Sequence, residues 1–191
     1  MNYSVLLLSL LLSVSLIACG GAEHDHHEET PDQLALSETT AHSEASDEFA
    51  TSFADAVSAY LDLKDALVET DAATAREKAE YLHAKLEDVS HEGLADEDAS
   101  FWENTVAEMR SGTENITTEE DVEEQRYQFE YVSNAFIATF DRFGNMGMTV
   151  YQQTCPMVRG GSADWISAEG QVMNPYHGER MMNCGSVVRT F

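Results

Sequence analysis

Helical periodicity runs from residue 47 to residue 143 and limits this chain to a mainly α fold. Apolar side chains recur there at intervals of three and four residues, which places them on one face of each helix. The clearest stripes are Phe49, Phe53, Val57, Tyr60, Leu63 and Leu67 in the first segment and Val122, Phe129, Val132, Phe136, Phe140 and Phe143 in the last. Four amphipathic helices with short connections favour an up-down-up-down bundle.

Capping residues predict where these helices begin and end. The predicted limits are Ser46 as the first cap, a second helix from Thr70 or Asp71 to about 91–93, a third over about 96–111, and a fourth from a Thr117–Glu120 capping box to Gly144. We therefore predict one globular domain over 47–191, with a bundle over 47–143 and an irregular or short-strand cap over 144–191.

The first residues are typical of an export signal. An apolar run over 5–17 is too short to span a bilayer comfortably, and Ala18, Cys19 and Gly20 follow it directly. Leu16-Ile17-Ala18-Cys19 resembles a bacterial lipobox, although residues 1–4 contain no Lys or Arg. We predict a lipoprotein signal peptide over 1–18, a lipidated Cys19, and a lipid-anchored protein of the cell envelope, periplasmic or outer-membrane. The alternative is an ordinary secretory signal with an incidental cysteine.

Residues 19–46 are predicted to form an acidic tether, because they contain too few large apolar side chains to order themselves. Within this segment, residues 23–29 contain three imidazoles, at His24, His26 and His27, among four carboxylates. Such a tract serves either as a hydrated spacer or as a weak site for a divalent metal.

The formal net charge of −25 is confined to the part of the chain before residue 146. Residues 146–191 contain three acidic and three basic residues, so this tail is neutral. Ten bases in the whole chain offer little for binding phosphate, so we expect no nucleic-acid partner. The neutral tail contains six of the eight methionines and two of the three cysteines, so sulfur is concentrated where charge is balanced.

Two sulfur clusters in the tail are the candidate metal ligands. Cys155 and Met157 are two residues apart in a segment whose alternation predicts a strand, which would point both sulfurs to one side. Met181 and Cys184 are three apart, so one helical turn would place them on one face, and His177 is nearby. Two thiolates with two thioethers suit Cu(I) better than zinc.

The tail also resembles a known bacterial domain family. The similarity is carried by Cys155-Pro156-Met157, Asn174-Pro175-Tyr176-His177-Gly178, Met181 and Cys184-Gly185. That family, catalogued as a domain of unknown function, occurs as small lipoproteins and joined to periplasmic adaptor subunits of copper/silver-type heavy-metal efflux systems. The resemblance implies Cys155, Met157, Met181 and Cys184 as metal ligands, with an efflux adaptor or pump as partner. It leaves His177 a weaker candidate, because an aromatic residue often occupies that position.

A structural interpretation of the same cysteines stays open. Outside the cytoplasm, Cys155 and Cys184 could form a disulfide that fixes the tail to the bundle. The methionines would then serve only as apolar side chains in the packing of the tail. An enzyme is not expected, because the sequence contains no Cys-x-x-Cys pair, no Ser/His/Asp grouping and no glycine-rich phosphate loop.

Overall fold

The computed structural model describes residues 42–191 and confirms a mainly α fold in which four helices precede a small antiparallel sheet. The elements are α1 (Asp47–Val68), α2 (Ala72–Glu87), α3 (Asp96–Thr118), α4 (Val122–Phe143), β1 (Tyr151–Val158), β2 (Gly161–Ser167), the 3-10 helix η1 (Gly178–Arg180) and β3 (Ser186–Thr190). The predictions for Cys19, His24, His26 and His27 lie outside the described residues. Within 42–191, no helix is both long and apolar enough to cross a membrane.

Three predicted caps are confirmed. Ser46 Oγ accepts a hydrogen bond from the Phe49 N–H at the start of α1. Asp71 caps α2, where its carboxylate accepts from two backbone N–H groups. Gly144 ends α4 with a φ of 70°, a conformation that favours glycine, and its N–H donates to the Phe140 carbonyl.

Two predicted helix ends were wrong. Helix α2 ends at Glu87 rather than near residues 91–93, although Val89 beyond it is still buried. Helix α3 does not stop before Gly112 but continues to Thr118. A Cβ at Gly112 would lie 2.6 Å from Val132 Cγ2 on α4, so glycine here permits close packing of two helices rather than ending one.

The predicted capping box at the start of α4 was also wrong. Thr117 belongs to the last turn of α3, where its hydroxyl donates to the Glu114 carbonyl. The true cap is Asp121, whose carboxylate accepts from the Glu123 N–H at 2.8 Å.

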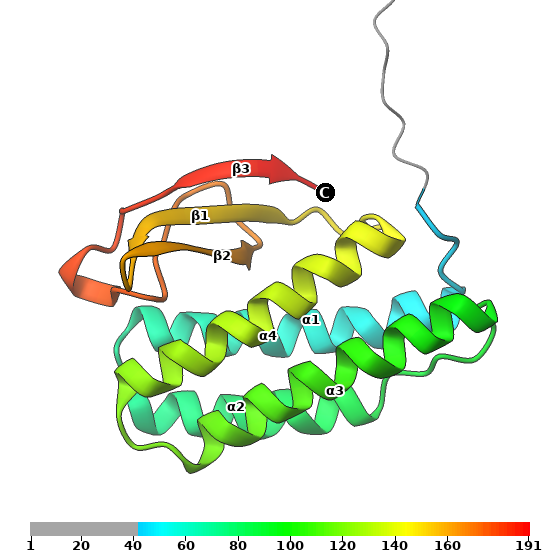
Figure 1. The fold of residues 1–191 in the computed structure, drawn as a ribbon, viewed down its shortest axis with the longest axis horizontal. Coiled ribbons are helices and arrows are strands. Elements are labelled where there is room, and N and C mark those ends of the chain that lie inside the picture. The colour runs from blue at the N-terminus through cyan, green and yellow to red at the C-terminus, as the bar shows by residue number, and fades with distance from the viewer. Residues whose placement is uncertain (1–41) are drawn as a thin grey trace, which may run out of the picture. The chain divides into compact units, whose positions relative to one another are not determined.

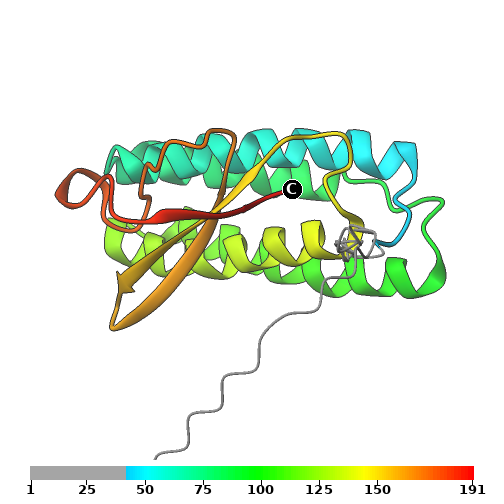
Figure 2. The same cartoon turned by 90° about the horizontal axis from the view of Figure 1, so that it is seen from above.

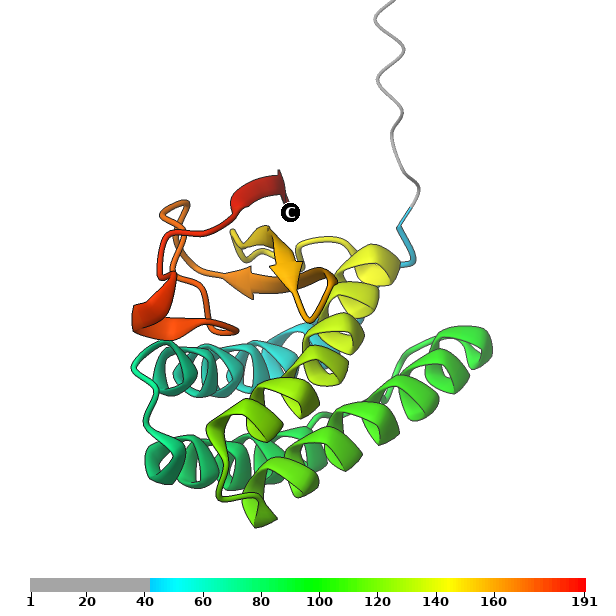
Figure 3. The ribbon, with the colours of Figure 1, turned by 60° about the vertical axis from the view of Figure 1, so that its left-hand side comes forward.

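Aromatic side chains fill the space between α1 and α4. Phe53 and Tyr60 of α1 each lie against Phe136 of α4, with ring centroids 5.5 and 4.5 Å apart. Phe49 contacts Phe143 at one end of the same interface. Helices α2 and α3 lie on the side of this pair away from the sheet (Figures 1 and 3).

The sheet lies over α1 and α4 and has the strand order β2-β1-β3, with both pairings antiparallel (Figure 2). Tyr60 joins the two layers, because its hydroxyl is 2.7 Å from Ser133 Oγ on α4 and accepts from the Ile166 N–H of β2 at 3.1 Å. The bundle is therefore the support on which the sulfur-rich tail is positioned.

Candidate functional site

The structure brings Cys155 and Cys184 together. Their Sγ atoms are 3.2 Å apart, although 29 residues separate them in the chain, and both cysteines are free. Cys155 is fully buried, whereas Cys184 is half-buried. The two thiols thus form a pair with one inner and one outer member.

The strands and a glycine fix this approach. Cys155 lies in the central strand β1, opposite Ala163 of β2. Its neighbour Thr154 pairs with Ser186, the first residue of β3. Gly185 between the outer cysteine and β3 has a φ of 143°, and a Cβ there would lie 2.4 Å from the Thr154 carbonyl oxygen. Only glycine allows the chain to pass this close to β1.

Asn174 organises the loop that carries Cys184. Its buried side chain accepts from the N–H groups of Tyr176 and His177, and its Nδ2 donates to the Cys184 carbonyl at 2.7 Å. Its backbone N–H donates to the Met182 carbonyl. The Asn174 side chain therefore connects the first part of the loop, at Tyr176 and His177, to its last part, at Cys184.

Arg126 of α4 attaches the same loop to the bundle. Its guanidinium is 1% exposed and donates to the Pro175 carbonyl at 2.7 Å and to the Leu67 carbonyl at 2.8 Å. It also pairs with Glu123, one turn earlier on α4. The sequence patterns did not single out this residue. The sequence did contain one indication of its burial. Arg126 lies four residues after Val122, on the apolar face of the predicted helix, in a chain that contains only ten basic residues.

The regular strand that was expected to point Cys155 and Met157 to one side is interrupted between them. The pairing of β1 with β2 changes register between Cys155 and Val158. Met157 lies within this irregular stretch and is 54% exposed, whereas Cys155 is fully buried. Its thioether is therefore on the surface of the cap.

Met181 and Cys184 are connected by a hydrogen-bonded turn rather than by a turn of regular helix. Helix η1 ends at Arg180, and the next residues form a turn in which the Cys184 N–H donates to the Met181 carbonyl at 2.9 Å. Met181 is 37% exposed, so the second candidate thioether also reaches solvent.

His177 contacts the backbone of Met157. Its Nε2 is 3.0 Å from the Met157 carbonyl oxygen, so the imidazole donates this hydrogen bond when Nε2 is protonated. The half-buried ring also lines a cavity of about 430 Å³ between the start of α4 and the β1–β2 hairpin. The His177 side chain therefore connects the start of η1 to β1. A metal could bind Nε2 only if the hydrogen bond to the Met157 carbonyl were broken.

The neighbouring sulfur favours the protonated form of Cys184. The hydrogen bond with Cys155 raises the pKa of the Cys184 thiol above its usual value, and partial burial raises it further. A cation that binds both sulfurs would replace the proton shared between them, and its positive charge would stabilise the thiolates that the metal-free pair disfavours.

The donor chemistry of the pair fits a soft metal, although the cluster is small. Within residues 42–191, no group of three or more His, Cys, Asp or Glu side chains is arranged to hold a metal ion. The separation of 3.2 Å exceeds the roughly 2.05 Å of a disulfide. It is shorter than the maximum of about 4.6 Å for two sulfurs each about 2.3 Å from one ion. Small movements would therefore convert the pair into either arrangement.

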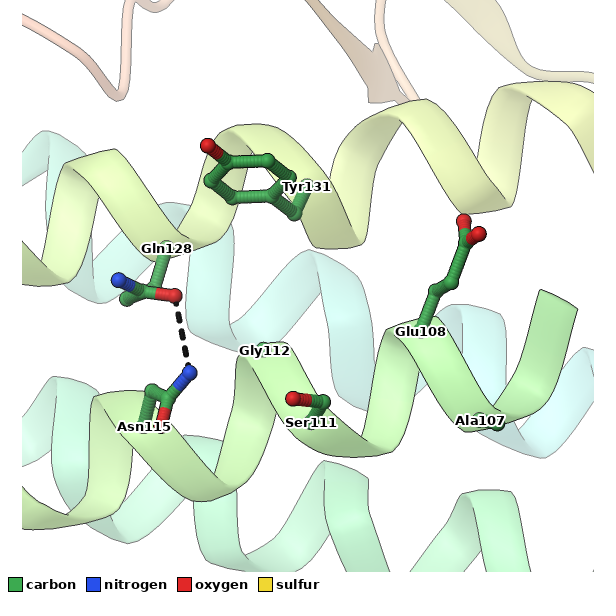
Figure 4. Close-up of a pocket in the computed structure, with 7 residues that line it drawn as sticks. All are labelled: Ala107, Glu108, Ser111, Gly112, Asn115, Gln128 and Tyr131. Atoms are coloured by element: carbon green, nitrogen blue, oxygen red, sulfur yellow. Dashed lines mark hydrogen bonds between the residues drawn. The ribbon is translucent and has the colours of Figure 1, made fainter.

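A groove of about 570 Å³ between α3 and α4 offers no comparable chemistry (Figure 4). Asn115 donates to Gln128 across it, and Gly112 is one of the residues that line it. None of the cysteine, methionine or histidine residues predicted as ligands lines it.

Comparison with known families gives one match. Residues 56–147 match a family described as "Protein of unknown function (DUF3347)". The family is uncharacterised. The match covers most of the helical part and stops before β1, so it does not include the four sulfur residues predicted as ligands. No curated protein and no solved structure matches the chain.

Proposed function

We propose that this protein is a membrane-anchored binding protein for a soft monovalent metal, Cu(I) or Ag(I), which it sequesters or hands over to a heavy-metal efflux system. Cys155 and Cys184 supply thiolates, and Met157 and Met181 supply thioethers. The observation that supports this most is the 3.2 Å approach of two free sulfurs in a tail that also exposes two methionines.

The choice of metal follows from the donors. Thiolate and thioether sulfur are soft ligands, and they favour Cu(I) over Mg²⁺, Ca²⁺ or Mn²⁺. Met157 and Met181 are the proposed further sulfur donors, and both are exposed and flexible. Met157 lies in the irregular stretch of β1, so its side chain would have to turn toward the pair to reach an ion held by the cysteines. His177 serves as an exchange ligand at most, because its Nε2 is bonded to a carbonyl.

The anchor and the partner rest on the sequence alone. Lipidated Cys19 would hold the protein at a membrane surface, with the acidic segment before residue 42 as its tether. Residues 42–46 are attached to the bundle, where the Ser43 N–H donates to the Arg142 carbonyl. An efflux adaptor or pump would receive the metal. We expect the wild-type chain to enter the detergent phase in a detergent-partition assay, and the Cys19→Ser variant to remain in the aqueous phase. Equal partition of both would contradict the anchor.

The binding test is a competition between the reduced full chain and a chromogenic Cu(I) chelator. We expect one tightly held Cu(I) per chain, lost in the Cys155→Ser/Cys184→Ser double variant. A His24→Gln/His26→Gln/His27→Gln variant is the control for the tether and should retain the tight site. Equal competition by the wild type and the double cysteine variant would refute the proposal. Circular dichroism of each variant verifies that it is folded.

The thioethers are tested separately. We expect Met157→Leu and Met181→Leu to weaken Cu(I) retention, because each removes a sulfur while keeping an apolar side chain of similar volume. Met173→Leu is the matched control in the same tail. Equal weakening by all three substitutions would contradict a specific role for the two exposed methionines.

The alternative function is structural: a non-catalytic lipoprotein with a Cys155–Cys184 disulfide and no metal. The same 3.2 Å approach favours it, because little movement would form the bond. A thiol count on protein that is purified without reductant and then unfolded in denaturant separates the two, because Cys155 is buried in the folded chain. The metal-binding proposal predicts two reactive thiols from this pair in the unfolded chain once metal is removed by a chelator. No reactive thiol from either cysteine until reductant is added would favour the structural disulfide.

A further inference from the structure

We propose that Cys184 is a site of thiol–disulfide exchange, with Cys155 as its resolving thiol, and that this exchange switches the metal site off. The exchange itself stands on the geometry of the pair. Its effect on metal rests on the proposed function. The incoming oxidant belongs to a defined chemical class, a disulfide of a small thiol or of a redox protein.

Exposure decides which sulfur reacts first. A thiolate attacks a disulfide only if the other molecule can approach its sulfur closely. Cys155 is fully buried in the central strand β1, so an external disulfide has no access to its Sγ. Cys184 is half-buried in a turn at the surface of the cap. The first bond to the oxidant therefore forms at Cys184.

Proximity decides the second step. Cys155 Sγ is 3.2 Å from Cys184 Sγ, so the resolving thiol is already beside the sulfur that it must attack. The Cys184 backbone is held on both sides, by Asn174 Nδ2 at its carbonyl and by Met181 at its N–H. Gly185 then passes directly against β1. The buried thiol thus has a fixed target, and a mixed disulfide at Cys184 is expected to be short-lived.

The two steps balance as ordinary exchange. In the first, Cys184 loses its proton to solvent, a step that its raised pKa slows but does not prevent, and the thiolate attacks the oxidant R–S–S–R, forms Cys184–S–S–R and releases one R–S⁻. In the second, the Cys155 thiolate attacks Cys184 Sγ, forms the Cys155–Cys184 bond and releases a second R–S⁻. The protein loses two protons and two electrons, and the electrons reduce the oxidant to two thiols.

This reaction and metal binding compete for the same sulfurs. A soft metal ion needs the two thiolates as ligands, and the disulfide removes both charges at once. A bound ion in turn occupies Cys184 and slows its attack on the oxidant. The pair would then release metal under oxidising conditions and accept it under reducing ones.

The exchange arm of the test uses the reduced, metal-free full chain with oxidised glutathione, and peptide mapping to locate each adduct. In the Cys155→Ser variant we expect one glutathione to accumulate on Cys184. In the Cys184→Ser variant we expect Cys155 to remain unmodified over the same time. The wild type should form the internal disulfide with little mixed adduct. Equal modification of Cys155 and Cys184 in the two variants would overturn the assignment of roles.

The metal arm compares the reduced and oxidised wild-type chains in Cu(I) chelator competition, and times the exchange with and without prebound Ag(I). We expect the oxidised chain to lose the tight Cu(I) site, and prebound Ag(I) to slow glutathione-driven oxidation at least tenfold. Equal Cu(I) retention by both redox forms would overturn the switch. A reduced chain that binds no Cu(I) would refute the proposed function and the switch, while the exchange roles of the two cysteines would still be decided by the first arm.

Discussion

Replacement of Arg126 by methionine is the sharpest test of how the bundle holds the site. The substitution removes a buried guanidinium that donates to the Pro175 carbonyl, to the Leu67 carbonyl and to Thr70 Oγ1. Methionine fills similar space without donors. The Pro175 carbonyl is then left without this partner in a buried position.

The magnitude follows from those contacts. A buried carbonyl that loses its donor costs about 1–3 kcal/mol, which applies to Pro175. Leu67 keeps a hydrogen bond from the Thr70 N–H, so the lost bond there adds at most about 1.5 kcal/mol. We therefore expect Arg126→Met to lower the free energy of unfolding by about 1–4.5 kcal/mol, measured by urea denaturation of the reduced protein.

Arg180 provides a matched control. It pairs with the same Glu123 carboxylate at 2.7 Å, but its side chain is 62% exposed. An exposed ion pair contributes about 0–1 kcal/mol, so Arg180→Met should be nearly neutral although it removes the same charge. Equal losses in the two variants, or a loss below about 1 kcal/mol for Arg126→Met, would refute the role given to the buried guanidinium.

Three further predictions concern the buried tyrosine, the close glycine and the cysteine pair. Burial raises the pKa of Tyr60, so the folded state keeps a proton that the unfolded chain loses above about pH 10. Above about pH 10, this one group should therefore lower the free energy of unfolding by about 1.4 kcal/mol per pH unit. Urea denaturation at several alkaline pH values should show a shallower fall for Tyr60→Phe than for the wild type. An equal fall per pH unit in the two proteins would contradict the role of the buried tyrosine. Gly185→Ala should cost more unfolding free energy than Gly160→Ala, because both have a positive φ but only Gly185 would place its Cβ against backbone; equal costs would remove the close-approach argument. Oxidation of Cys155 and Cys184, which are 29 residues apart, should raise the free energy of unfolding by up to about 3.6 kcal/mol, and an unchanged denaturation midpoint would show that the bond strains the fold.

The helices were predictable because their periodicity is local. Phe53 and Tyr60 of the stripe on α1 and Phe136 of the stripe on α4 are buried as predicted. The errors lie where tertiary packing overrides a local rule. Gly112 continues α3 because Val132 of another helix packs against it, and no residue within α3 signals that contact.

The candidate site was less predictable for a similar reason. Residue types in the tail indicate sulfur chemistry, but no local spacing predicts that Cys155 and Cys184 approach each other across 29 residues. The placement of Met157 depends on a register change in β1, which simple alternation misses. Arg126 acts through the Pro175 carbonyl on a distant segment, so its role is visible only in the fold.

The central claim is that sulfur from Cys155 and Cys184 binds the metal, and X-ray absorption at the copper edge of the Cu(I)-loaded full chain tests it most directly. We expect a first coordination shell dominated by sulfur, which disappears in the Cys155→Ser/Cys184→Ser variant. A shell of nitrogen and oxygen that is the same in both proteins would contradict this claim, because the metal would then be bound elsewhere in the chain.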